Sequence, residues 1–171
     1  MRQAQTSKIF FRTLTIIYSA MLLGQLAFIS IVIFLKLPSG RIDASGFSFP
    51  FSVVLPFLTI TCLIASSIVY RVLVKSAQLK EKLVDKMPIY QSALIVKLAL
   101  IEGPSLFSVV IFLMTGQVYF LIFTLILLLI FITSKPGRQK AIDELKLDMS
   151  ESELVRNDDS IICQMQSKFQ F

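Results

Sequence analysis

The stretch SALIVKLALIEGPSLFSVVIFLMT, residues 92–115, decides the fold class of this chain. An α-helix needs about 20 apolar residues to cross the roughly 30 Å hydrocarbon core of a bilayer, and this stretch is long and apolar enough to do so. Three further apolar segments qualify, at 13–35, 51–70 and 118–134. The last of them, with about 17 residues, only just spans the core. The pattern predicts an all-α integral membrane four-helix bundle.

The composition agrees with membrane residence and narrows the chemistry. The chain has 171 residues, of which 55% are hydrophobic and 16% charged, and its mean hydropathy is +0.76. Soluble domains have about 45–50% apolar and about 25% charged residues. Histidine is absent, which excludes histidine-ligated haem, most zinc and copper sites and Ser/His/Asp triads. We therefore expect no enzyme activity, no catalytic residue, no metal site and no cofactor.

The basic residues are distributed unevenly, and their distribution predicts the orientation of the spans. Three Lys or Arg precede the first span, five lie between residues 71 and 86, and six follow Ser134. The loop after the first span has two, and the turn at 115–117 has none. Because loops rich in Lys and Arg stay in the cytoplasm, both termini and the central loop are expected there, in contact with anionic lipid headgroups. We do not expect nucleic-acid binding.

The four spans define one predicted domain, residues 1–147, which ends in a short interfacial helix at 136–147. The polar tail, 148–171, begins with the stretch DMSESELVRNDDS, which is acidic and poor in apolar residues, so we expect the tail to be disordered. Within the domain, QLAFISIVIFL at 25–35 and GPSLFSVVIFL at 103–113 share one Ser and the letters VIFL at an offset of 78. This similarity favours two parallel helical hairpins, with a chance match between apolar segments as the alternative.

Glu102 lies near the middle of the third span and is followed at once by Gly103 and Pro104. A charge at the bilayer centre costs at least ~2.5–3.5 kcal/mol, so such a residue faces protein or water and usually has a task. Because the ionised carboxyl is poorly solvated there, we expect Glu102 to be mostly protonated at neutral pH. Pro104 removes the amide donor of the Leu100 carbonyl, so we expect the helix to kink or break at this point.

Counting residues from the span ends places other polar side chains at the depth of Glu102. Gln25 is the preferred partner, because its amide can donate to and accept from a protonated carboxyl. We expect Glu102 and Gln25 to carry a proton or an ion. The supporting residues are Tyr18, Thr59, Thr61, Gly103, Pro104, Ser105 and Thr124. The alternative is a structural clamp, in which these groups only hold the four helices together by hydrogen bonds.

The stretch LALIEGPSLFSVVIFL, residues 98–113, resembles the ion-carrying helix of the proteolipid, subunit c, of rotary ATP synthases, and the likeness extends back to residue 66. This resemblance implies that Glu102 is the ion-carrying carboxylate and Gln25 a co-ligand. The chain departs from that family because its second span lacks the glycine repeat, and because it has Pro104, two additional spans and a tail. As a whole, the chain resembles small four-span bacterial inner-membrane proteins of unknown function, which implies that location but no activity.

Two functions are left open by the sequence. In the first, the chain is a proton- or cation-responsive or transporting membrane protein that uses Glu102. In the second, it is a structural or assembly subunit of a larger membrane complex, docked through its central loop or its tail, with no activity of its own. The lipid bilayer is the expected partner in both, and a homo-oligomer or a membrane complex is a further option. A membrane enzyme is least favoured, because no nucleophile has a base in reach.

Overall fold

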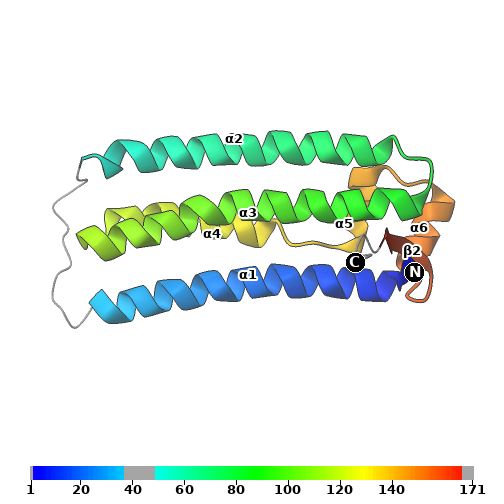
Figure 1. Cartoon of the computed structure of the whole chain (residues 1–171), viewed down its shortest axis with the longest axis horizontal. Helices are drawn as coiled ribbons and strands as arrows, with labels where there is room; N and C mark the ends of the chain where they lie inside the picture. The colour runs from blue at the N-terminus through cyan, green and yellow to red at the C-terminus, as the bar shows by residue number, and fades with distance from the viewer. Residues whose placement is uncertain (1, 37–48, 167–171) are drawn as a thin grey trace, which may run out of the picture. The chain divides into compact units, whose positions relative to one another are not determined.

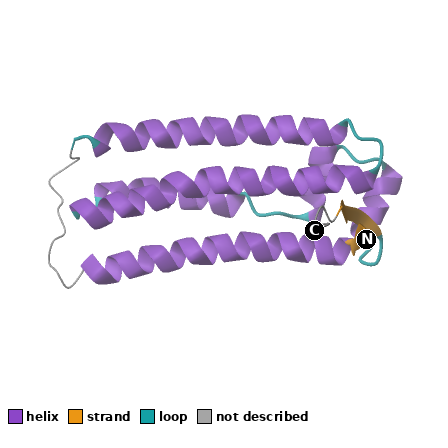
Figure 2. Cartoon of the chain, viewed as in Figure 1, coloured by secondary structure: helices purple, strands orange, loops and turns teal. Residues whose placement is uncertain are grey.

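The computed structural model describes residues 2–36 and 49–166 (Figure 1). Helices account for most of these residues, and the two strands are short (Figure 2). In chain order the elements are β1 (Arg2–Thr6), α1 (Ser7–Lys36), α2 (Phe51–Gln78), α3 (Leu83–Thr115), α4 (Tyr119–Thr133), α5 (Arg138–Leu145), α6 (Met149–Arg156) and β2 (Ile161–Gln166).

Three helices, α1, α2 and α3, are long and apolar enough to cross a membrane, with 30, 28 and 33 residues. Helix α4 has only 15 residues and reaches the length of a span together with α5, from which it is separated by an 82° bend. The prediction of a helical chain with several candidate membrane spans is therefore confirmed: residues 2–36 and 49–166 contain three candidate spans, or four if the bent pair counts as one. The antiparallel pair of β1 and β2 is additional.

The chain divides into two compact units. Unit 1 consists of Met1–Tyr18, Ile68–Val96 and Lys135–Phe171, and unit 2 consists of Ser19–Ser67 and Lys97–Ser134. Helices α1, α2 and α3 each contribute residues to both units. The sequence predicts a single domain over 1–147 instead, because the apolar runs continue across the boundary between the units.

The core of unit 1 combines the three long helices with the C-terminal elements. Phe10 and Phe11 of α1 pack edge to face, with ring centroids 5.3 Å apart. The guanidinium carbon of Arg138 lies 5.7 Å from the centroid of the Phe11 ring. The C-terminal members of this core are Ala141, Ile142, Leu145, Val155, Ile162 and Cys163. Helix α5 is therefore a core element of unit 1, where the sequence predicts an interfacial helix.

The tail, for which the sequence predicts disorder, contains α6 and β2 within its described residues 148–166. Asp148 begins α6 because its carboxylate accepts a hydrogen bond from the amide of Glu151 at 2.7 Å, and this bond lowers the pKa of Asp148. Strand β2 pairs with β1, from Arg2 opposite Gln166 to Thr6 opposite Ile161. The partners of the tail are distant in sequence, so its acidic composition does not reveal them. Residues 167–171 lie outside the described residues.

Lys146 follows α5 in the left-handed conformation, with φ 50° and ψ 50°. This conformation costs an L-residue roughly 1 kcal/mol, and glycine largely avoids the cost. Because Lys146 is exposed, Lys146→Gly is expected to raise the free energy of unfolding by about 0.5–1 kcal/mol, measured by denaturant titration in detergent. Lys140→Gly, inside α5, should lower it by about 1 kcal/mol. A loss of that size in Lys146→Gly would contradict the prediction.

Unit 2 has its own core, which we call the apolar cluster. Its buried members come from all four helices α1–α4 and are Val32, Leu55, Val109, Ile111, Phe112 and Phe120. The two matching stretches of the sequence have different surroundings in this unit. Ser108 and Phe112 are buried, whereas Ser30 and Phe34, at the equivalent positions, are exposed. The sequence similarity therefore does not correspond to equivalent side-chain environments.

Candidate functional site

A set of buried polar side chains lies next to the apolar cluster in unit 2. On three helices the polar residue is four positions from a cluster member and so on the same helix face: Thr59 from Leu55, Ser105 from Val109, and Thr124 from Phe120. On α1, Gln25 is seven positions from Val32, two turns along the same face. In each helix the polar residue lies deeper inside the helix than the cluster member, by four to seven residues or about 6 to 10 Å along the helix axis. We call Gln25, Thr59, Ser105 and Thr124 the polar layer.

Some buried polar groups of unit 2 hold helices together. Thr124 on α4 donates its hydroxyl to the carbonyl of Ser105 on α3 at 3.3 Å. Ser108 on α3 donates to the carbonyl of Phe120 on α4. Ser66 on α2 donates to the carbonyl of Lys97 on α3 at 3.3 Å. These three bonds are what the structural clamp predicts, because each joins two helices.

The rest of the polar layer does not behave as a clamp. The side-chain atoms Oε1 and Nε2 of Gln25, Oγ1 of Thr59 and Oγ of Ser105 are buried and have no hydrogen-bond partner among the described residues. Gln25 and Ser105 are 0% exposed and Thr59 is 7% exposed. A buried polar group without a partner costs about 1–3 kcal/mol, and native structures contain few of them. Three such side chains, on three different helices, therefore need an explanation other than helix packing.

Glu102 lies on α3, three residues before Ser105, and is half-buried. Within the part of the chain that the structure describes, its carboxyl makes no hydrogen bond and no ion pair, and the amide of Gln25 has no partner either. The hydrogen bond that the sequence predicts between Glu102 and Gln25 is therefore absent from the structure. A side-chain contact of this kind depends on how each helix is rotated about its axis, and residue depth does not determine that rotation.

Helix α3 runs without interruption from Leu83 to Thr115, through Gly103 and Pro104. The predicted alternative of two half-helices is therefore not observed. Pro104 is buried, whereas Gly103 is exposed. A Cβ atom added at Gly103 would meet no heavy atom within 4 Å, so close packing does not require glycine there.

Besides Gly103 and Pro104, two of the predicted supporting residues, Tyr18 and Thr61, are not part of the polar layer. Tyr18 belongs to unit 1, while Gln25 belongs to unit 2. Thr61 is exposed, because it is two positions from Thr59 and so lies on another face of α2. The sequence reasoning missed Ser66 and Ser108, both of which are buried. The signal that could have found Ser108 is its spacing of three residues from Ser105, which places both hydroxyls on one face of an apolar helix.

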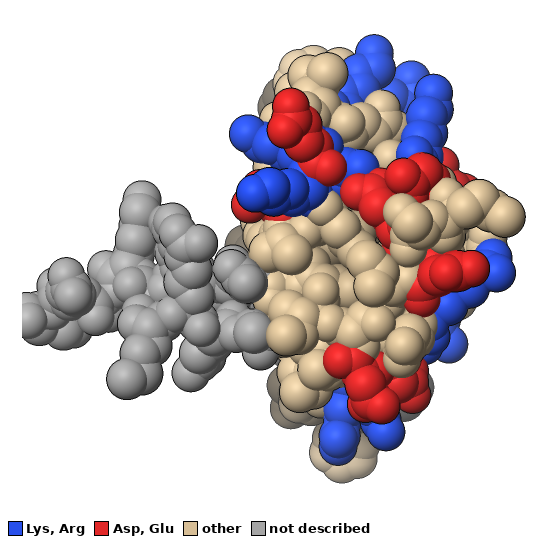
Figure 3. Space-filling model, turned by 90° about the vertical axis from the view of Figure 1, so that its right-hand side faces the viewer, with Lys and Arg blue, Asp and Glu red and all other residues tan. Residues whose placement is uncertain are grey.

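The charges are divided between the units. Of the described charged residues, only Lys36, Lys97 and Glu102 belong to unit 2, and all others belong to unit 1. On the face seen in Figure 3, acidic and basic side chains lie beside one another. The described residues contain no group of three or more His, Cys, Asp or Glu side chains that could hold a metal ion. Glu102 and the polar layer together thus offer one carboxyl, one amide and three hydroxyl groups.

These groups can carry a proton on the carboxyl, or surround a small cation with oxygen atoms. The carboxyl of Glu102 is the ionisable member, and the amide and hydroxyls supply neutral donors and acceptors. No protein-family model, curated protein or solved structure matches the chain.

Proposed function

We propose that the chain is a multi-pass protein of the bacterial inner membrane, with both termini cytoplasmic, and that it exchanges a proton or a small cation at Glu102 within the bilayer. The distribution of charge supports a bilayer location for unit 2, which has three described charged residues. Its segments of α1–α4 contain between 15 and 19 residues each, or about 22–29 Å, which is close to the ~30 Å hydrocarbon core.

The observation that carries the proposal is the set of buried, unpartnered side chains Gln25, Thr59 and Ser105. In a low-dielectric environment such groups bind whatever can complete their hydrogen bonds. Glu102 is one turn of α3 away from Ser105 and is itself without a partner among the described residues. A proton or a small hydrated cation satisfies both a carboxyl and neutral oxygen atoms, which accounts for the presence of both kinds of group.

The alternative, a structural or assembly subunit, has less support. Three interhelical hydrogen bonds show that part of the polar set does hold helices together. The clamp does not account for Gln25, Thr59 and the Ser105 hydroxyl, which bond to no other helix. The tail, one of the two predicted docking segments, is used inside unit 1 as far as it is described.

The proposal predicts that a hydrophobic carbodiimide labels Glu102 at neutral pH, because the reagent needs a protonated carboxyl in an apolar site. Glu102→Gln should remove the label and lower proton or cation flux into proteoliposomes at least ~10-fold, since the amide cannot exchange a proton. Flux is read with a pH-sensitive or cation-sensitive dye inside the vesicles, and folding is checked by circular dichroism.

Glu81→Gln is the matched control, because it makes the same chemical change at an exposed position of unit 1. Its labelling at Glu102 and its flux should equal those of the wild type. If Glu102 of the folded wild type takes up no label and Glu102→Gln keeps full flux, the exchange role is wrong and the subunit role is favoured.

A further inference from the structure

The C-terminal elements α5, α6 and β2, residues 138–166, make specific polar contacts with all three long helices of unit 1. We call them the C-terminal clasp. At α1, the clasp supplies acceptors to the first turn: the amide of Ser7 donates to the carbonyl of Ser160 at 2.9 Å, and the amide of Lys8 donates to that of Asp158 at 3.2 Å. The Ser7 hydroxyl donates to the carbonyl of Val155 at 2.5 Å. The amides at a helix N-terminus have no partner inside the helix, so the clasp completes α1.

At α2 and α3, the clasp is held through Glu144. The hydroxyls of Tyr70 on α2 and Tyr90 on α3 both donate to the same oxygen, Oε2, of this carboxylate, the second at 3.0 Å. The side-chain amide of Gln78 donates to the backbone carbonyl of Glu144 at 2.6 Å. One residue of α5 thus connects two long helices.

A second contact with α3 is an ion pair that is almost hidden from solvent. Nζ of Lys86 lies 2.7 Å from both carboxylate oxygens of Glu151 on α6. The two side chains are only 10% and 14% exposed. Removing one member of such a pair leaves an uncompensated buried charge, whereas replacing both by apolar residues is often neutral. Docking of α6 on α3 therefore requires both charges of the Lys86–Glu151 pair.

The clasp is too short to stay folded when it is detached from the long helices of unit 1. Helices α5 and α6 have 8 residues each, shorter than the ~12–15 that even a good isolated helix needs in water. Their buried residues, among them Leu145 and Val155, have their apolar contacts in the core of unit 1. Opening of the clasp should therefore be a single event in which all its contacts are lost together.

We propose that the C-terminal clasp is a reversible strap, which opens as one unit while the three long helices stay folded, and that the Lys86–Glu151 pair controls its opening. Opening removes the C-terminal members of the core that Phe10, Met87 and Leu94 share with Leu145 and Val155, and so exposes part of the apolar surface of the long helices. The strap thus determines when this surface is accessible. This inference does not rest on the proposed role of Glu102.

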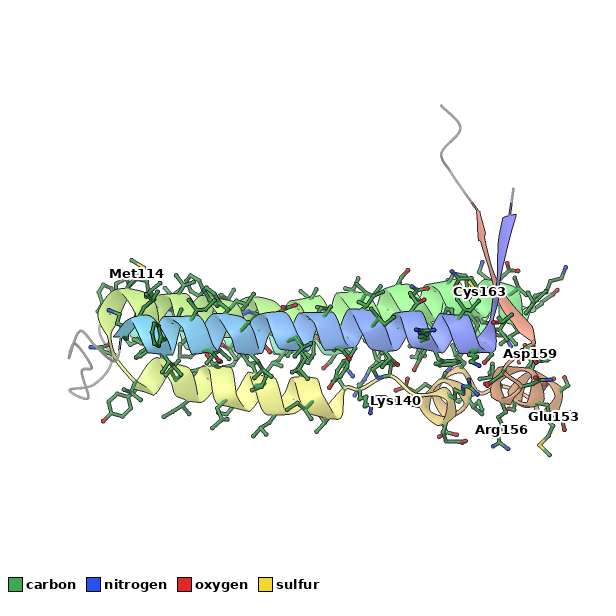
Figure 4. The ribbon with its side chains drawn as sticks, turned by 90° about the horizontal axis from the view of Figure 1, so that it is seen from below. Met114, Lys140, Glu153, Arg156, Asp159 and Cys163 are labelled. Carbon is green, nitrogen blue, oxygen red and sulfur yellow. The ribbon has the colours of Figure 1, made fainter. Side chains whose placement is uncertain are left out.

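Cys163 lies on β2 (Figure 4). The reactivity of its thiol can therefore be used to measure opening of the clasp. Its side chain is 0% exposed, and burial raises the pKa of its thiol, so the closed strap should react slowly with thiol reagents. Cys62 is the other cysteine, and Cys62→Ser leaves Cys163 as the single reporter. The full-length protein in mild detergent is treated with excess maleimide at constant pH, and the labelling rate is followed by mass spectrometry.

If the clasp opens reversibly, Cys163 should be labelled at least ~10-fold more slowly than in the SDS-unfolded protein. Its labelling should also be at least ~10-fold faster than the loss of helicity under the same conditions. Lys86→Met and Glu151→Gln should each accelerate labelling by about 100-fold, because each leaves a buried group without its partner. The double variant Lys86→Met/Glu151→Leu should label more slowly than either single variant. Glu153→Gln is the control, since Glu153 is an exposed carboxylate on the same helix as Glu151 and its loss should change the rate less than ~3-fold.

Two results would overturn the inference. In the first, Cys163 becomes reactive only as the helical signal disappears, which means that the clasp is not a separate unit. In the second, the single variants keep the wild-type rate, which means that the ion pair does not control opening. If a Lys86 variant fails to fold, Tyr90→Phe tests the opening of the clasp instead. It removes one hydrogen-bond donor to Glu144 and should also accelerate labelling of Cys163.

Discussion

A chain that ends at Lys135 is expected to lose the C-terminal part of the core of unit 1, while its three long helices stay helical. The truncation removes the buried side chains of Ile142, Leu145, Val155 and Ile162, each worth about 1.5–3 kcal/mol when fully buried. The sum exceeds about 5 kcal/mol, which is comparable to the whole stability of a small domain. The truncation also removes Glu151, which is the ion-pair partner of Lys86 on α3.

Hydrogen exchange measured residue by residue is the appropriate readout of this truncation. Amides of the α1, α2 and α3 segments in unit 1 should exchange faster, whereas the circular dichroism signal should fall only by the share of α5 and α6, because the long helices stay helical without the clasp. All residues that are removed belong to unit 1, so the segments of unit 2 should change less. A chain that ends at Gln166 is the matched control, because it keeps β2 entire. Wild-type protection of unit 1 in the Lys135 truncation would show that the clasp contributes no stability.

Hydropathy predicts the three long helices but not where they begin and end. The first span is predicted at 13–35, yet α1 begins at Ser7 and passes Lys8 and Arg12. The helix extends because Phe10 and Phe11 enter the core of unit 1, which compensates for the charged residues Lys8 and Arg12. A window of bilayer length reports only the apolar part of a helix, so the extensions that build unit 1 are not visible to it.

The fold of the tail depends on contacts that no local pattern contains. Ser7 donates to the carbonyl of Val155 across 148 residues of sequence, and Lys86 meets Glu151 across 65. Taken alone, an acidic segment with few apolar residues satisfies the usual criteria for disorder. Of its apolar residues, Val155, Ile162 and Cys163 are buried, whereas Met149, Leu154 and Ile161 are exposed. Their positions become meaningful only when the surface that receives them is known.

For the candidate site, the sequence predicts depth better than it predicts contacts. Gln25, Thr59 and Thr124 lie well inside apolar helices, and the structure buries all three. Their hydrogen bonds could not be predicted, because a bond between helices depends on the rotation of both. Thr124 has a partner on α3, whereas Gln25 has none among the described residues. This difference separates the clamp from a binding site, and it can be measured.

Gln25→Leu is expected to stabilise the protein while it impairs exchange at Glu102. Leucine has a volume close to that of glutamine and carries no polar atoms, so the variant removes two buried atoms that have no partner. The gain should be about 1–3 kcal/mol, measured as the free energy of unfolding by SDS in mixed micelles. Carbodiimide labelling of Glu102 and flux into proteoliposomes should fall in the same variant, because one neutral donor and acceptor of the polar layer is lost.

Thr124→Val provides the contrast, because it deletes a buried hydroxyl that does have a partner. Loss of its bond to the Ser105 carbonyl should cost about 0.6 kcal/mol, the average for hydrogen bonds between membrane helices. The free energy of unfolding should thus rise in Gln25→Leu and fall in Thr124→Val, because a buried polar group stabilises a fold only when it is paired. If Gln25→Leu destabilises the protein as Thr124→Val does, then Gln25 is a structural residue. A gain in stability together with a loss of exchange means that the fold tolerates an unpaired amide at this depth because exchange requires it.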